Sequence, residues 1–336
     1  MSLTSNESTP TLLNDYTFKT DLLTIMSDTA PETNDKLKHH AKAILQEVRS
    51  TMTSIYPYGV STYRLLDAMI DGSEQAGLST GVHYAAAAIL VAYQKGEASN
   101  SSASELTKLA HDWFFFLLWP FKKTFRPSYS PQSEFSTPTP QSHASKVIVD
   151  TVPAASQNSH FLDLLTRREG DKCAVTGALN TFNAPHPRTH REAQLNGAHI
   201  LPRSIVQEHP EGNRIAGTID IIKHFTNLPL SIIDDMSRMI DDPSNGMLLE
   251  QTLRYASDCY MCCLDSTDVL DKYKIHWFRS IPSDLEDFTE VQFKDHSQTG
   301  IPPPNPMFIV LRSAISHILN LSGASEAIDK QGRVPS

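Results

Sequence analysis

The residues best suited to chemistry lie in the second half of the 336-residue chain, between Arg167 and Tyr273. They fall in four short segments: RREGDKCAVTGAL, LNGAHILPRSI, DDPSNGMLLEQTLRYASD and DKYKI. The second segment contains His199, and a histidine can accept a proton near neutral pH, as a general base must. A lone histidine between apolar neighbours is more often a hydrogen-bonded core residue, so its interpretation depends on the surrounding segments.

The order of these segments resembles the HNH nucleases, in a divergent branch common in fungal proteins. The pattern of that branch is R-x-x-C-x-x-TG, then AHI-x-P, then N-G-x-x-L and a closing L-H-x-x-F-D. This chain has CAVTG from Cys173, AHILP from Ala198 and NGMLL from Asn245. The resemblance covers roughly residues 161–290, and it implies a two-stranded hairpin followed by a helix.

The resemblance also implies roles for individual residues. In the family the first strand brings a histidine that acts as general base, and the helix brings a ligand for one divalent ion. The base deprotonates water, and the ion neutralises the charge that builds on the leaving oxygen of a phosphodiester. His199 would be that base, and the side-chain amide of Asn245 would hold the base in place. The implied cofactor is Mg²⁺ or Mn²⁺, with Zn²⁺ as the other option.

One position departs from the family pattern. Where the family has its last histidine, nine residues after Asn245, this chain has Arg254. A guanidinium stays protonated and has no lone pair for a cation, so Arg254 removes a ligand and adds repulsion. If the 250s are helical, Glu250 and Asp258 lie one turn on either side of Arg254. They would either coordinate the ion or form ion pairs with Arg254, and the sequence leaves both readings open.

The distribution of charge bears on nucleic-acid binding. A net charge of −9 argues against a general coat of positive charge. Between residues 161 and 205, however, six cations stand against four anions, a local excess of two positive charges. The cations are Arg167, Arg168, Lys172, Arg188, Arg191 and Arg203. We expect Arg188, Arg191 and Arg203 to contact DNA phosphates, although an ordinary solvated surface gives the same count.

The cysteines indicate a reducing compartment. Three of the four are crowded at Cys259, Cys262 and Cys263, which excludes a spread disulfide framework. They are either small buried residues of a helix or part of a zinc site, which would need two more ligands. The N-terminus lacks the features of a signal peptide, and the most apolar runs reach about half the length that spans a bilayer. We therefore expect an intracellular protein, cytoplasmic or nuclear, with no membrane segment.

Apolar periodicity predicts a helical domain over residues 35–126, after a disordered tail over residues 1–34. One of its helices is expected to end near Gly72. Another begins with a capping box, Ser102 with Glu105, and is expected to stop at Pro120. A linker rich in Pro, Ser and Thr follows over residues 127–160.

The chain closes with a helix and a tail over residues 291–336. Asn305 is placed to cap this helix, Pro306 to begin it and Gly323 to end it. An apolar stripe along it requires a partner, either the helical domain or the back of the motif domain.

Together these features predict an α+β protein: an N-terminal helical domain, a flexible joint, an HNH-like ββα-metal domain over residues 161–290, and a C-terminal helix. The predicted function is that of an HNH-family metal-dependent DNA endonuclease or a degenerate descendant of one. The alternative is a catalytically inactive HNH-fold module that binds nucleic acid or, through the helical domain, a protein.

Overall fold

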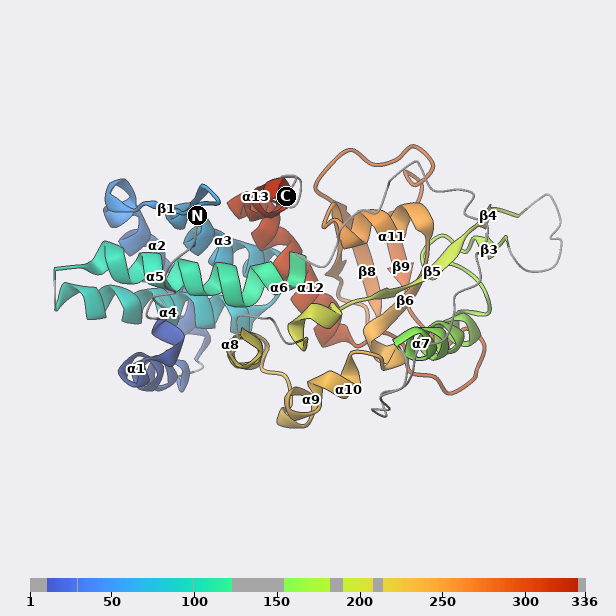
Figure 1. Cartoon of the computed structure of the whole chain (residues 1–336), viewed down its shortest axis with the longest axis horizontal. Helices are drawn as coiled ribbons and strands as arrows, with labels where there is room; N and C mark the ends of the chain where they lie inside the picture. The colour runs from blue at the N-terminus through green and yellow to red at the C-terminus, as the bar shows by residue number, and fades with distance from the viewer. Residues whose placement is uncertain are drawn as a thin grey trace, which may run out of the picture.

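The computed structural model describes residues 11–28, 30–98, 100–122, 154–181, 190–207 and 214–331. It is an α+β structure with helices at one end of its long axis and small sheets at the other (Figure 1). The C-terminal helices lie between these two parts. Among the described residues, no single helix is long and apolar enough to cross a bilayer, and one pair passes that test only with a bend of 82°.

The helical part is built around α4 (Ser79–Glu97). Ala85, Ala86, Ala87 and Ala88 are fully buried in it, and their small side chains let neighbouring helices approach from several sides. The helices packed on α4 are α1 (Tyr16–Met26), α2 (Pro31–Val48), α3 (Thr62–Gln75) and α5 (Ser102–Trp113). A short β-bridge pairs β1 (Ser54–Ile55) with β2 (Val60–Ser61).

The expectation of a disordered tail was wrong from residue 11 onward; residues 1–10 lie outside the described part of the chain. A short 3-10 turn, η1 (Leu12–Asn14), leads into α1, where the Asp15 carboxylate accepts hydrogen bonds from the first backbone N–H groups. Phe18 and Leu22 are buried, and the backbone N–H of Leu13 donates to Asp112 on α5. The helix is stabilised by this long-range packing, which a short segment with few apolar positions does not reveal.

Three expected helix signals in this part were also wrong. α3 continues past Gly72, because the missing side chain there admits α12: a Cβ would lie 2.7 Å from Ile318. The capping box does not form, since Ser101 is the N-cap and Glu105 pairs with Lys108. After α5 the chain passes through a π-helical turn, η3 (Phe114–Leu118), into α6 (Trp119–Lys122), so Pro120 lies in the first turn of a new segment, where proline is tolerated.

The sheet part begins with α7 (Ala154–Glu169), which starts inside the expected linker over residues 127–160; residues 123–153 lie outside the described ranges. Two strands, β5 (Leu195–His199) and β6 (Gly246–Glu250), pair antiparallel, and α11 (Gln251–Asp258) follows directly. This is the predicted ββα arrangement. A parallel pair, β3 (Leu179–Asn180) and β4 (Glu192–Ala193), precedes it.

A three-stranded antiparallel sheet follows the ββα arrangement. Its strands are β7 (Cys262–Ser266), β8 (Lys272–Trp277) and β9 (Glu290–Gln292). Cys262 and Cys263 therefore lie on a strand, and the helical reading of these cysteines was wrong. Cys259 is the C-cap residue that follows α11.

The long connection from β5 to β6 carries its own helices. They are η4 (Arg203–Ile205), α8 (Arg214–Thr226), α9 (Leu230–Asp234), α10 (Met236–Met239) and η5 (Pro243–Asn245). α8 docks on the helical part: the Phe225 ring meets Tyr84 edge-on at 6.1 Å, and Thr80 donates a hydrogen bond to the Phe225 carbonyl. The two parts thus share one hydrophobic core.

α12 (Pro306–Ser322) connects both parts, and α13 (Ala324–Gln331) follows it. Its predicted boundaries are confirmed: Asn305 accepts from the N–H of Met307, Pro306 is the first residue, and Gly323 adopts φ +76°. The helix packs on α3 and on β7, so both expected partners contact it. Arg312 of α12 donates to the carbonyls of Ile200 (2.8 Å) and Ser257 (2.7 Å).

Candidate functional site

His199 is the last residue of β5 and pairs with Gly246, the first residue of β6. The next N–H, that of Ile200, donates to the carbonyl of Asn245 at 2.9 Å. The AHI and NG segments therefore lie side by side at one end of the strand pair, as the family pattern predicts. α11 follows the other end of β6 and contacts both strands.

Asn245 is fully buried and clamps the loop that follows His199. Its Oδ1 accepts from the N–H of Leu201 at 2.8 Å, and its Nδ2 donates to the carbonyls of Leu201 (3.0 Å) and Ile240 (2.9 Å). A single amide thus satisfies three backbone groups on two loops. Asn245 has the geometry of a positioning residue, because its side chain contacts backbone on both sides of the site.

The imidazole of His199 stacks on an aromatic ring, which fixes its orientation. Phe161 of α7 stacks on it with a centroid distance of 4.3 Å and an interplanar angle of 4°. The Phe161 ring also lies against Gly246, where a Cβ would come within 2.4 Å of it. The glycine of the NG segment therefore makes room for the ring that orients His199.

The second contact of His199 is a carboxylate: Nε2 lies 3.1 Å from Oδ1 of Asp241. Arg203 forms an ion pair with the same oxygen at 2.5 Å. Because an ionised carboxylate only accepts hydrogen bonds, the proton of neutral His199 is assigned to Nε2, which leaves the lone pair on Nδ1. Asp241 thus fixes the tautomer of the ring.

The environment keeps His199 neutral. Burial lowers its pKa below the ordinary value of 6.5, and the charges of Arg203 and Arg254 lower it further, while Asp241 acts in the opposite direction. A neutral imidazole at pH 7 is what a general base requires.

Arg254 lies on α11, and its charge contributes to the lowered pKa of His199. Its Nε lies 3.4 Å from Asp258 Oδ2, so of the two readings left open by the sequence the structure has the i,i+4 ion pair. Glu250, by contrast, is not helical: it is the extended residue before α11, opposite Leu195 at the far end of the strand pair. Four residues of strand, about 13 Å, separate the Glu250 and His199 positions, so Glu250 cannot share an ion with His199.

The buried carboxylate of Glu250 is instead bound by two side chains. Arg191 reaches both of its oxygens, at 2.8 and 3.2 Å, and Thr176 donates to it at 2.7 Å. The Arg191 guanidinium also donates hydrogen bonds to the side-chain and backbone oxygens of Asp284. The expectation that Arg191 contacts phosphate therefore does not fit its position, because all of its bonds hold the domain together.

The six cations counted between residues 161 and 205 likewise do not all face solvent. Arg168 is fully buried and donates to the carbonyls of Pro243, Gly246 and Pro302, which ties α7 to the site. Arg188 lies outside the described residues. Arg203 is the predicted phosphate-contacting residue that the structure brings to His199.

The surroundings of His199 do not fit a divalent ion. Among the described residues, Asp241 is the one carboxylate hydrogen-bonded to His199, and Arg203 already shares its oxygen. The neighbouring residue on β5 is the buried Ala198, and Arg254 adds a fixed positive charge. Ions such as Mg²⁺ require several oxygen ligands, which this arrangement does not supply.

Sequence reasoning missed two residues of the site, Asp241 and Phe161. A signal for Asp241 was present in the DDPSN segment, because two adjacent acidic residues precede Asn245 by three and four positions. Asp242 is used locally, where it caps η5, and this leaves Asp241 for the site. No comparable local signal marks Phe161, which stacks on His199 from a separate helix.

This part of the chain matches a known protein family. Residues 173–265 match the family model described as HNH endonuclease, a range that contains Cys173, His199, Asn245 and Arg254. Comparisons with curated proteins and with solved structures gave no match. Domains of this family typically use a divalent metal ion and imply nucleic-acid binding. With the paired strands, the following helix and the histidine at their junction, residues 173–265 form an HNH endonuclease-family domain.

Proposed function

We propose that the HNH domain binds the phosphodiester backbone of DNA at the His199 end of the β5–β6 pair, and that arginines take the place of the divalent ion there. The protein would thus be a descendant of the metal-dependent endonucleases that keeps the nucleic-acid site. The observation that carries the proposal is that Arg203 lies 2.5 Å from the Asp241 oxygen that is itself 3.1 Å from His199 Nε2, while Arg254 occupies the family's last histidine position on α11.

The chemistry of the site supports an anionic ligand. Arg254 pairs with Asp258 through Nε, and its side chain is 41% exposed. Arg203 is 27% exposed beside Asp241. A guanidinium binds phosphate oxygens through paired N–H donors, so both arginines have the chemistry to contact a phosphate at this site.

Equilibrium binding of labelled duplex DNA across a salt series tests this proposal. We expect wild-type protein to bind at low salt, with log affinity falling linearly against log salt. Arg254→Gln and Arg203→Gln should each weaken binding and flatten that slope by up to about 0.9. Arg279→Gln is the matched control, since Arg279 is 49% exposed and pairs with a single carboxylate, Glu326, at 3.2 Å.

The proposal fails if wild-type protein does not bind DNA at low salt. It also fails if Arg254→Gln and Arg279→Gln both bind DNA with the same affinity as wild type. Replacing His199 with alanine should leave binding intact, because the neutral imidazole contributes no charge.

A second candidate, retained endonuclease activity, is favoured by the His199–Asp241 pair. A neutral imidazole oriented by a carboxylate can accept a proton from water through Nδ1, and the arginines can stabilise charge on the phosphate. A plasmid-nicking assay with purified protein tests this function across Mg²⁺, Mn²⁺, Ni²⁺ and Zn²⁺. If nicking occurs, His199→Ala should lower its rate by about 10² to 10⁴; activity that survives this change would exclude His199 as the base.

A further inference from the structure

A cluster of metal-binding side chains lies where β7 and β8 meet α12, apart from the His199 site. Cys263 and Asp265 are two residues apart on β7, so they point to the same face of the sheet. His276 on β8 is the direct cross-strand partner of Cys263. His317 of α12 packs over this face, with its Nε2 3.0 Å from Asp265 Oδ1.

The separations of three of these ligand atoms match those around a tetrahedral ion. Cys263 Sγ lies 3.4 Å from Asp265 Oδ1 and 3.7 Å from His317 Nε2. Zinc bonds of about 2.3 Å to sulfur and 2.0–2.1 Å to nitrogen and oxygen place tetrahedral ligands roughly 3.3–3.6 Å apart. The 3.4 and 3.7 Å separations lie in or beside this range, and the 3.0 Å between His317 and Asp265 is below it, so an ion can enter with side-chain shifts of a few tenths of an ångström.

From this geometry we propose that Cys263, Asp265 and His317 bind a zinc ion, with His276 as the fourth ligand. His276 approaches from the exposed side: its Nδ1 lies 3.4 Å from Asp265 Oδ2, and its ring meets that of His317 at 4.8 Å. One thiolate, two imidazoles and one carboxylate form a donor set that suits Zn²⁺ and disfavours Mg²⁺.

Burial and access are consistent with a structural ion. Cys263 and His317 are 6% and 1% exposed, whereas the side chains of Asp265 and His276 are 21% and 42% exposed. The ion therefore has a path from solvent and a protected inner side. Burial raises the pKa of the Cys263 thiol, so zinc must displace that proton as it binds.

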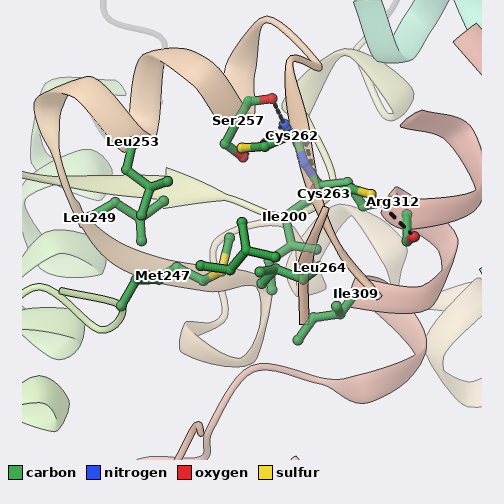
Figure 2. Close-up of a pocket in the computed structure, with 13 residues that line it drawn as sticks. Ile200, Met247, Leu249, Leu253, Ser257, Cys262, Cys263, Leu264, Ile309 and Arg312 are labelled. Carbon is green, nitrogen blue, oxygen red and sulfur yellow. Dashed lines mark hydrogen bonds between the residues drawn. The ribbon is translucent and has the colours of Figure 1, made fainter. Parts of the chain in front are cut away.

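The position of the ion indicates a structural role. It would pin α12 to the β7–β8 hairpin, while Arg312 of the same helix holds the carbonyl of Ile200, next to His199. Figure 2 shows Cys263 and Arg312 near one another around a small apolar cavity between the strands and α12. Zinc there stabilises the junction between the two parts of the molecule and contacts neither Arg203 nor Arg254.

Cobalt substitution tests the site in the full-length protein. Co²⁺ should give intense tetrahedral bands in the visible region and a thiolate charge-transfer band in the near ultraviolet, and Zn²⁺ should displace it. Cys263→Ala should abolish the charge-transfer band. Cys262→Ala is the matched control, because the neighbouring thiol is 5% exposed and points to the opposite face.

A second variant keeps the test valid if Cys263→Ala does not fold. His276→Gln changes a half-exposed side chain, so it should fold and bind zinc at least tenfold more weakly; His296→Gln, with a side chain 38% exposed, is its control. Zinc should also raise the melting temperature of wild type more than that of His276→Gln. Absence of the thiolate band in wild type, or equal zinc affinity in wild type and His276→Gln, overturns the proposal, whatever the DNA-binding result.

Discussion

Burial has the largest effect on the pKa of His199, and three charged side chains add to it or oppose it. Burial disfavours the imidazolium form, the charges of Arg203 and Arg254 disfavour it further, and Asp241 favours it. The net effect is a pKa below 6.5. Arg254, the residue that departs from the family pattern, thus favours the neutral form of His199, and its positive charge would repel a metal ion.

Titration of His199 by NMR should show these contributions separately. Arg254→Gln and Arg203→Gln should each raise the pKa of His199 toward 6.5, because each removes a neighbouring positive charge. Asp241→Asn should lower it, and Arg279→Gln should leave it unchanged. The His199 resonance is assigned by its loss in His199→Gln. An unchanged pKa in Arg254→Gln would show that this arginine does not act on the site.

The same shift gives His199 a pH-dependent effect on stability. The unfolded chain takes up this proton near pH 6.5, while the folded protein holds it more weakly. The free energy of unfolding should therefore fall as pH drops below about 6.5, and His199→Gln should remove that part of the dependence. Urea titrations of the two proteins at pH 5 and 7.5 would measure the difference, which disappears if the folded-state pKa is not lowered.

Arg254→His should create divalent-metal affinity at the HNH site. The change removes the fixed charge and restores the imidazole that the family pattern has at this position, beside His199 and Asp241. Calorimetry with Zn²⁺ and Mn²⁺ should be done in a Cys263→Ala background, so that binding at the cluster on β7 does not mask the result. Arg279→His is the control. Equal heats for Arg254→His and its background would show that the site lies elsewhere.

At the scale of elements, the β5–β6 pair, α7 and η5 hold the site as one unit. Phe161 fills the space left by Gly246, Asn245 closes the loops, and Arg168 fixes η5 and β6 from α7. None of these residues carries out chemistry, yet they determine where His199 points.

Gly246→Ala should therefore destabilise the domain. The new Cβ would lie 2.4 Å from Phe161, so the ring must move, and overpacking of this kind typically costs about 1–3 kcal/mol. Gly197→Ala on the paired strand is the matched control, because its Cβ would meet Leu165 at an ordinary 3.4 Å. Urea unfolding measures both variants. Equal destabilisation by the two changes would refute the role of the Phe161 contact.

At the scale of the whole molecule, α8 and α12 join the helical and sheet parts. In the sequence both helices lie near the motif segments. In the structure each packs on the helical part, α8 on α4 and α12 on α3. The shared core predicts that the two parts unfold together.

Phe225→Ala tests this coupling. Removing a fully buried ring should lower the free energy of unfolding by about 3–5 kcal/mol. Hydrogen exchange should then accelerate in β5 and β6 as well as in α4, because one cooperative transition exposes all three. Leu230→Ala, a change at a side chain 57% exposed, is the control. Loss of protection confined to α4 would show that the parts unfold independently.

Several features followed from the sequence alone because they depend on local geometry or on a specific ordered pattern. The boundaries of α12 follow from Asn305, Pro306 and Gly323, which act within one turn of the helix ends. The strand pair that carries His199 followed from the AHI and NG segments. Arg254 and Asp258 form one of the two arrangements that the sequence left open, because helical spacing places them on one face.

Other features were decided only by the tertiary structure. Glu250 pairs with Arg191, 59 positions away, and the histidine of the site meets Asp241 and Phe161 from separate elements. Cys263 joins Asp265 and His317 because a sheet and a distant helix converge. Local spacing cannot predict such partners, since packing across the core determines which side chains of distant segments meet.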